Sequence, residues 1–206
     1  MKKAPIKSIK KTTLTLMKSL ILLTYFTLLM SCNQQTISYK EISQRTEASQ
    51  DMAKKFGKTL KGKLQTAMKS GGPIAAISVC NQQAPLIAAE LSKQSGWEIY
   101  RTSLKPRARK PDAWDKRMMK SFEQRHEDGD KYKSLFNQDI SKVDEIASFR
   151  FIQAIETQKI CLVCHGENIA PAIANKITEL YPNDKAIGFK EGDIRGAFSI
   201  IQPIIK

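Results

Sequence analysis

Two cysteines and a histidine lie within five positions in the C-terminal part of the chain. Residues 161–165 read Cys-Leu-Val-Cys-His, which is the C-x-x-C-H pattern at which a c-type haem is attached. Two thiols must add to the two vinyl groups on one edge of the porphyrin, and residues three apart on a helical turn share a face. The imidazole of His165 would then bind the iron as its proximal ligand. The pattern predicts one covalent haem c, attached to Cys161 and Cys164.

Haem c is attached outside the cytoplasm, and the N-terminus carries the features of an export signal. Residues 1–31 contain six lysines and no acidic residue, and a short apolar stretch covers residues 20–30. A basic segment followed by a short apolar segment is typical of a secretory signal. A membrane-spanning helix needs about 20 predominantly apolar residues, whereas this stretch becomes polar at Ser31.

The sequence Leu29-Met30-Ser31-Cys32 resembles the bacterial lipobox, in which the cysteine is lipidated and becomes the first residue of the mature protein. We therefore expect a signal peptide at 1–31, a lipid on Cys32, a tether at 32–40 and one domain at 41–206. The mature protein would be exported and anchored by its lipid on the periplasmic side of a bacterial membrane. Asn33 favours the outer membrane where the cell has one.

The net charge narrows the range of binding partners to be expected. The whole chain carries +14, and without the six N-terminal lysines it carries about +8. A mildly basic exported domain suits an acidic redox partner or signalling protein, or an anionic membrane surface. No nucleic-acid-binding motif is present, so no nucleic acid is expected as a partner.

Hydrophobic periodicity predicts mixed helices and strands. A long amphipathic helix over about 41–70, with Phe56 and Leu60 inward, should end at Gly71-Gly72-Pro73. Asn81 should cap a second helix that ends near Ser95. A third helix, over 112–126, should bury Trp114, Met118 and Phe122, and a fourth is expected over 171–180. Strands are expected at 97–104, 145–157 and 194–205, the last with Ile194, Phe198 and Ile200 on one face. This order predicts an antiparallel α+β domain.

Cys80 is the thiol that remains after Cys32, Cys161 and Cys164 are assigned. It precedes the predicted cap Asn81, where a helix N-terminus would stabilise a thiolate, and a thiolate is a good sixth ligand for ferric iron. A small buried apolar cysteine is the alternative. His126, Met118 and Met119 are weaker candidates for the sixth ligand, and an open position would bind small molecules.

Several further stretches resemble one family, the PAS-like c-type haem domains, which are single-haem sensor modules long catalogued as a domain of unknown function. The resemblance covers about residues 41–203. It rests on Val79-Cys80-Asn81, Arg101-Thr-Ser-Leu104, Pro111-Asp-Ala-Trp114, Cys161-Leu-Val-Cys-His-Gly166, Tyr181-Pro182 and Gly192-Asp-Ile-Arg-Gly-Ala197. The loop Arg107-Ala-Arg-Lys-Pro111 departs from the Arg-Asn-Pro loop that is common in the family.

The resemblance implies a PAS-like fold, with haem against an antiparallel sheet and with His165 and Cys80 as the two axial ligands. Arg101 and Arg107, and less strongly Arg109, are candidates to pair with the haem propionates, because a guanidinium matches a carboxylate in shape.

Two classes of function remain. The first is a membrane-anchored mono-haem cytochrome without enzymatic activity, acting in redox or gas sensing or in electron transfer. The second is a haem-free thiol–disulfide oxidoreductase that uses Cys161 and Cys164; the late position of the pair and the adjacent histidine speak against it. A zinc site at Cys80, Cys161, Cys164 and His165 is less favoured still, because no second C-x-x-C is present.

Overall fold

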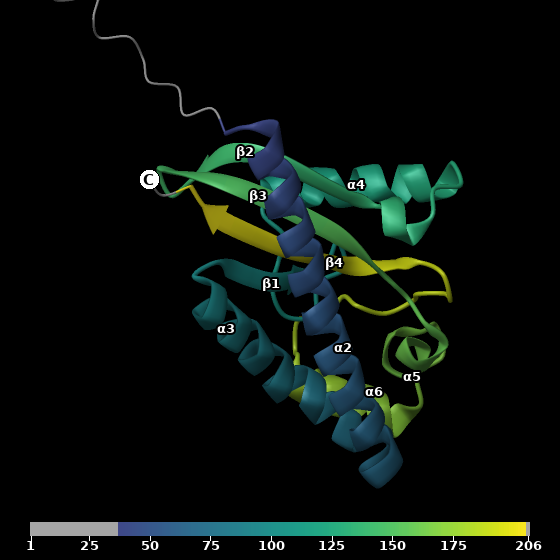
Figure 1. Ribbon diagram of the computed structural model, residues 1–206. Helices are drawn as coiled ribbons and strands as arrows, with labels where there is room; N and C mark the ends of the chain where they lie inside the picture. The colour runs from purple at the N-terminus through teal and green to yellow at the C-terminus, as the bar shows by residue number, and fades with distance from the viewer. Residues whose placement is uncertain (1–36, 205–206) are drawn as a thin grey trace, which may run out of the picture. The chain divides into compact units, whose positions relative to one another are not determined.

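The computed structural model describes residues 37–204 (Figure 1). The predicted signal peptide, Cys32 and most of the predicted tether lie outside the described residues. The described part is an α+β domain with a long N-terminal helix and a four-stranded antiparallel sheet, so the predicted antiparallel α+β class is confirmed, whereas the PAS-like assignment stays a prediction. No helix within residues 37–204 combines the length and apolar character needed to cross a membrane.

The sheet has the strand order β1-β4-β3-β2, and every neighbouring pair is antiparallel. Its strands are β1 (Glu98–Thr102), β2 (Phe136–Val143), β3 (Ile146–Glu156) and β4 (Ile194–Pro203). Strand β2 was not predicted. It is joined to β3 by a two-residue turn in which Asp144 and Glu145 both have positive φ, as tight hairpin turns require.

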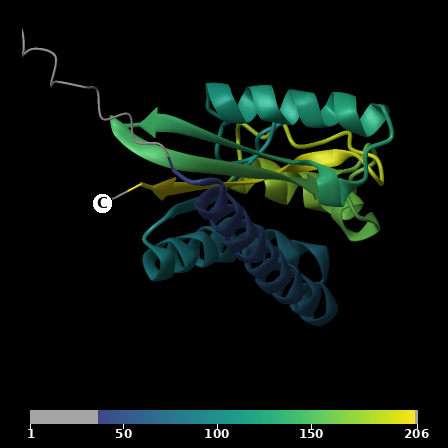
Figure 2. The same cartoon turned by 45° about the horizontal axis from the view of Figure 1, so that its top comes forward.

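Helices cover both faces of this sheet (Figure 2). On one face, α2 (Tyr39–Ser78) and α3 (Ala84–Ser95) contribute Phe56, Leu60 and Leu91 to a core with Phe149 and Phe151. On the other face, α4 (Ala113–Glu127) packs its own apolar residues against the sheet. Its buried apolar residues are Trp114, Met119 and Phe122. Met118, which was predicted to face the core, is partly buried and packs against it, and the adjacent Met119 has no exposed surface.

The long helix breaks at the predicted glycines, but the chain resumes a helix at once. Gly72 has φ 67° and ψ −164°, a conformation essentially restricted to glycine. After Pro73 the chain is helical through Ser78, passes through a π-helical turn, η1 (Val79–Gln83), and continues directly into α3. Asn81 therefore lies inside a helical segment, and its prediction as a helix cap is wrong.

A β-bulge in β4 changes which side chains share a face. Ile155 of β3 pairs with Gly196, whereas the next residue, Glu156, pairs with Ile194. Arg195 is thus an extra residue in the pairing, and bulges of this kind re-aim a side chain. Ile194 consequently packs in the α4 core, whereas Phe198 packs in the α2 core, so the prediction of one shared face is wrong.

The segment that carries the C-x-x-C-H pattern packs against the end of the long helix. It contains a 3₁₀ turn, η3 (Lys159–Cys161), and the short α5 (Leu162–His165), followed by α6 (Pro171–Leu180). Ile173 and Ile177 of α6 form a small core with Ile77 of α2, against which Val163 and Cys164 pack. This core fixes the segment beside the helical turn that contains Cys80.

Two glycines of the long helix should respond oppositely to the same substitution. Gly72→Ala forces a side chain into a glycine-only conformation and should lower the free energy of unfolding by about 1–3 kcal/mol. At Gly62 an added Cβ meets nothing within 4 Å, so Gly62→Ala should raise stability by up to about 1 kcal/mol. Urea unfolding followed by circular dichroism measures both. Equal effects of the two substitutions would contradict a helix break at Gly72.

Candidate functional site

The predicted haem-attachment residues lie on consecutive turns at the edge of a cavity. Cys161 ends the 3₁₀ turn, and Cys164 and His165 lie in α5. The cavity has a volume of about 380 Å³ and lies among α2, the sheet and this segment. Cys80, Cys161, Cys164 and His165 all line it, and the three cysteines are free thiols. Cys80, far from the motif in sequence, is therefore brought to the same cavity.

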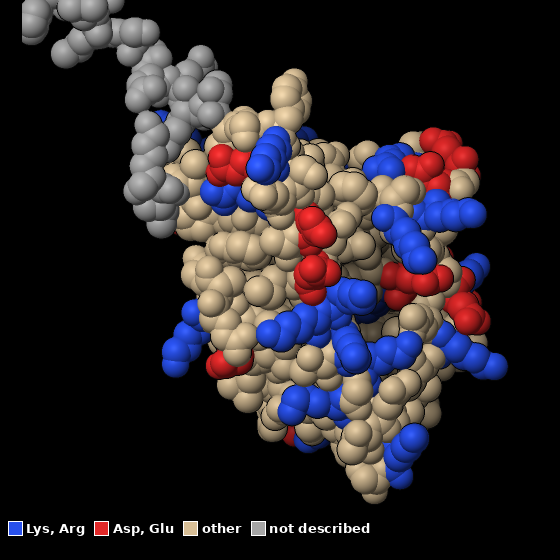
Figure 3. Space-filling view, in the orientation of Figure 1, with Lys and Arg blue, Asp and Glu red and all other residues tan. Residues whose placement is uncertain are grey.

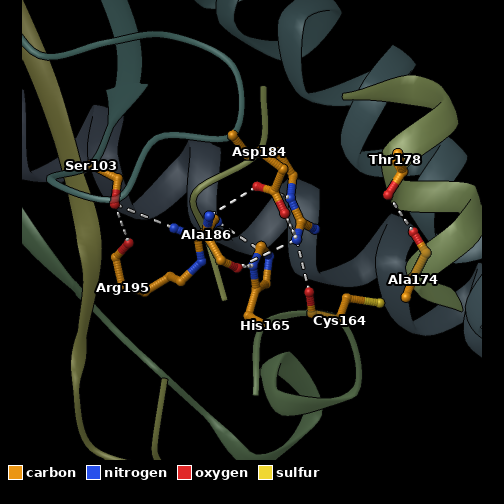
Figure 4. A network of polar contacts seen from close by, with 9 residues as sticks. Ser103, Cys164, His165, Ala174, Thr178, Asp184, Ala186 and Arg195 are labelled. Atoms are coloured by element: carbon orange, nitrogen blue, oxygen red, sulfur yellow. Dashed lines mark hydrogen bonds and ion pairs between the residues drawn. The ribbon is translucent and has the colours of Figure 1, made fainter. Parts of the chain in front are cut away.

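A short hydrogen bond at Nδ1 orients the His165 ring (Figure 4). Its Nδ1 lies 2.7 Å from the carbonyl oxygen of Ala186, and because a carbonyl only accepts, Nδ1 carries the proton and donates. Burial, followed by the charge of the Arg195 guanidinium, lowers the pKa of His165 well below its ordinary value. The ring is therefore neutral, with its lone pair on Nε2. A histidine that binds a metal characteristically donates its other nitrogen in this way.

The chain segment 186–189 supports the histidine from its backbone. The Phe189 N–H donates to the His165 carbonyl at 2.9 Å, and the Gly188 N–H donates to the Gly166 carbonyl at 3.0 Å. The Phe189 ring meets the imidazole edge-on, with centroids 6.3 Å apart. A Cβ at Gly166 would lie 2.6 Å from the Leu162 carbonyl oxygen, so the glycine that follows the motif is sterically required.

Arg107 joins this segment to the motif. Its guanidinium donates twice to the Asp184 carboxylate, both at 2.9 Å, and also to the Cys164 carbonyl at 2.8 Å. Asp184 in turn accepts from the Ala186 N–H at 2.9 Å. The pair is nearly buried, with side-chain exposures of 8% and 9%. Arg107 was predicted as a propionate contact; the structure places it where it positions the carbonyl that orients His165.

The other two arginines that were predicted to contact the propionates differ in exposure: Arg101 is half-buried and Arg109 is exposed. Arg101 lines the cavity. Arg109 lies at the surface, paired with Glu98 at 2.8 Å, with both side chains 48% exposed, and its guanidinium covers the Tyr100 ring.

Arg195 is a site residue that the sequence did not indicate. It is buried, with 7% exposure, and its Nη2 donates to His165 Nε2 at 3.2 Å. Its Nε has no hydrogen-bond partner, and none of the ion pairs found within residues 37–204 includes it. Burial and the charges of Arg101 and Arg107 lower its pKa to about 9. Strand alternation could not reveal this position, because the bulge shifts the register there.

A second cavity, of about 330 Å³, continues from the first. Five residues line both: Cys80, Arg101, Arg107, His165 and Arg195. Cys161 and Cys164 line only the first cavity, whereas Thr102 and Ser103 line only the second. The site therefore has an order: attachment thiols at one end, His165 and Cys80 in the middle, and the hydroxyl-bearing end of β1 beyond.

The structure removes one argument that the sequence offered for a thiolate at Cys80. The sequence placed it beside the free amides of a helix N-terminus, but it lies in the π-helical turn, where the amides bond within the helix. The Val79 N–H donates to Ala75 and Ala76 carbonyls, and the Ala84 N–H donates to the Val79 carbonyl. No free helix terminus stabilises a thiolate there. Cys80 differs from Cys161 and Cys164 in that it lines both cavities.

The competing ligands lie elsewhere. His126 contacts Tyr132 and the Asp130 carbonyl, and Met118 and Met119 pack in the α4 core. None of these three lines either cavity. Among residues 37–204, no group of three or more histidine, cysteine or acidic side chains is placed to hold a metal ion.

Comparison with known proteins identifies a family and a fold. The family model described as Tll0287-like matches residues 26–203. A solved structure described as the cyanobacterial heme-protein Tll0287 is similar, with a TM-score of 0.57 and 23% identity, over 82% of this chain and 99% of that one. At this identity the similarity shows the fold alone. No curated protein matches the chain.

The two arginine ion pairs of the 105–111 loop should contribute unequally to stability. Arg107→Ala leaves Asp184 nearly buried without its partner and should lower the free energy of unfolding by about 3–5 kcal/mol. Arg109→Ala removes a half-exposed pair and should cost no more than about 1 kcal/mol. Urea unfolding of both variants measures the difference. Similar small losses would show that Arg107 does not hold the segment beside His165.

Proposed function

The chain belongs to the Tll0287-like family, and from this membership and the geometry of the site we propose that it is an exported c-type cytochrome with one haem, acting in electron transfer or redox sensing. Cys161 and Cys164 would attach the haem, and His165 and Cys80 would be the axial ligands of its iron. When bound, the haem supplies a one-electron Fe(III)/Fe(II) couple. The similar solved structure is described as a heme-protein, which supports the proposal.

The observation that carries the proposal is that residues from two distant parts of the sequence line one cavity. The motif Cys161 to His165 and the isolated Cys80 meet at its wall. His165 is already in the tautomer that leaves Nε2 as the only possible ligand atom. The rest of the lining includes apolar side chains suited to a porphyrin face: Leu60, Leu64, Met68, Ile155 and Phe198.

Cys80 would serve as a thiolate because coordination to a metal deprotonates a thiol outright. If His165 and Cys80 both bind the iron, it would have no open position for a gas, and this would favour electron transfer or redox sensing over gas binding. A thiolate ligand would give a lower reduction potential than a methionine ligand. We further propose that the protein is held at the periplasmic side of a bacterial membrane by a lipid on Cys32, which lies outside the described residues.

The haem proposal can be tested on protein that is expressed with a signal for export and a cytochrome c maturation system. Three measurements are needed: haem staining of denaturing gels, absorption spectra, and haem staining of cell fractions. We expect haem that stays with the polypeptide in denaturing gels and that is lost from the polypeptide in the Cys161→Ala/Cys164→Ala variant. Cys80→Ala should retain the covalent haem but change the ferric spectrum. In cell fractions the haem-staining protein should move from membrane to soluble fraction in Cys32→Ala.

Three results would contradict parts of this proposal. A ferric spectrum that is unchanged in Cys80→Ala would remove Cys80 as a ligand, and membrane association that persists in Cys32→Ala would remove the lipid anchor. A protein without haem that reduces or isomerises disulfides through Cys161 and Cys164 would instead support the oxidoreductase alternative.

A lysine-rich face beside the cavity suits an acidic protein partner (Figure 3). Residues 52–89 contain six lysines and no acidic residue, and lysine and arginine side chains gather on this face of the molecule. Lys61 of α2 lines the cavity, as does Lys133 of the 3₁₀ turn η2 (Tyr132–Ser134). Lys54 and Lys58 are exposed one helical turn before Gly57 and Lys61, the residues at the cavity. We propose that an acidic redox protein docks on this face.

Charge reversal on this face should slow electron transfer to an anionic oxidant. Reduced Lys54→Glu/Lys58→Glu protein should react with hexacyanoferrate(III) about tenfold more slowly at low ionic strength, because attraction at the cavity mouth is lost. Lys116→Glu/Lys120→Glu changes the same charge at exposed positions of α4 and should have little effect. Stopped-flow absorbance measures the rates, and high salt should remove the difference.

Equal slowing by both pairs would show that only net charge matters and would contradict a docking face. If the two double variants react with hexacyanoferrate(III) at the same rate but differ in binding to vesicles that contain phosphatidylglycerol, the face binds a membrane surface rather than a protein.

A further inference from the structure

Arg195 is unusual because it is a buried cation that has no anionic partner within residues 37–204. Its side chain leaves the bulge of β4, and Nη1 lies 3.5 Å from the Ser103 hydroxyl. That hydroxyl donates to the Arg195 carbonyl at 2.9 Å, so it fixes the backbone of the bulge. The guanidinium keeps one N–H, on Nε, without any acceptor. A buried charge is normally paired or fully hydrogen-bonded, and Arg195 is neither.

The surroundings of Arg195 are suited to an anion. Arg101 lines the same two cavities, and the positive charges of Arg101 and Arg107 act on Arg195. Thr102 lines the second cavity and has a buried hydroxyl oxygen without a partner. Arg107 is already neutralised by Asp184. Within residues 37–204, this leaves Arg101, Arg195 and an unpaired hydroxyl at one end of the site.

We infer that Arg195, together with Arg101, forms a carboxylate subsite that binds the propionate groups of the haem. This rests on the proposed haem function. The attachment thiols line the first cavity only, Thr102 and Ser103 line the second cavity only, and Arg195 and Arg101 line both. The propionates of a haem lie on the edge opposite its vinyl groups, so they would point away from the thiols and toward the second cavity. A guanidinium matches a carboxylate in shape and charge, and such bonds are stronger than those between neutral groups.

The same residue would have two partners in turn. In the present structure Arg195 donates to His165 Nε2, the atom that would bind iron. One lone pair cannot serve both, so Arg195 has to release the imidazole when His165 becomes a ligand. Its guanidinium would then gain a carboxylate in exchange for a neutral acceptor. In the haem-free chain, Arg195 donates to the Nε2 lone pair until that exchange.

The subsite can be tested by changing the arginine and the propionates separately and together, as in a double-mutant cycle. In the full chain with Cys161→Ala and Cys164→Ala, haem binds without covalent bonds, so the affinities of haemin and of haemin dimethyl ester can be compared by absorbance titration. We expect the reference protein to prefer haemin about tenfold or more. Arg195→Gln should lose most of this preference by weakening haemin alone, and Arg195→Lys should retain part of it.

Arg109→Gln is the matched control, since Arg109 also lines the second cavity but is paired with Glu98. It should leave the preference intact. A preference that is unchanged in Arg195→Gln, or that falls equally in Arg109→Gln, would overturn the subsite. If the reference protein binds neither porphyrin, the proposed function itself fails, and the subsite with it. A ferric spectrum common to reference and Arg195→Gln would show that the axial ligands stay in place and that only the subsite is lost.

Discussion

The site depends on the hydrogen bond from His165 Nδ1 to the Ala186 carbonyl. A four-residue helix has too few internal hydrogen bonds to fix the rotation of a side chain at its end. The carbonyl has to be supplied by another segment, and that segment is itself held by Asp184 and Arg107. The order of dependence therefore runs from a loop arginine, through a carboxylate and a backbone carbonyl, to the imidazole. A protein that must present one nitrogen of a histidine to a metal needs this second layer as much as the histidine itself.

The local patterns predicted most of the elements correctly. Amphipathic spacing was sufficient for the helices around Phe56, Phe122 and Ile173. The glycines at 71 and 72 were predicted to end the long helix, and the structure shows a break at Gly72 after which the helix resumes. The motif at 161–165 was predicted to lie on helical turns, and the structure places it there. In each case the information lies within one element, because side-chain spacing and backbone conformation are set over a few residues.

Several features that the sequence missed depend on contacts between elements. Met119 is fully buried although only Met118 was predicted to face the core, because packing against the sheet, and not the periodicity of α4 alone, decides how deeply two adjacent methionines are buried. Asn81 looked like a cap, but packing of the preceding turn against α6 keeps the chain helical through it. Arg195 was hidden because a one-residue bulge reverses the alternation on which a strand prediction relies. Asp184 and Ala186 lie in a loop whose role is visible only from its partners.

The two irregularities of the fold face the same cavities. The π-helical turn carries Cys80, and the β-bulge carries Arg195; both residues line the two cavities with His165. In a regular helix or strand the direction of each side chain is fixed relative to its neighbours. Rotating the whole element to point one residue at the site would therefore move neighbouring apolar side chains out of the cores. An inserted residue changes the direction of one side chain and leaves the flanking register intact, and such insertions occur often at functional sites. The regular parts of this chain form the cores, and its departures from regularity supply the side chains that converge on the imidazole.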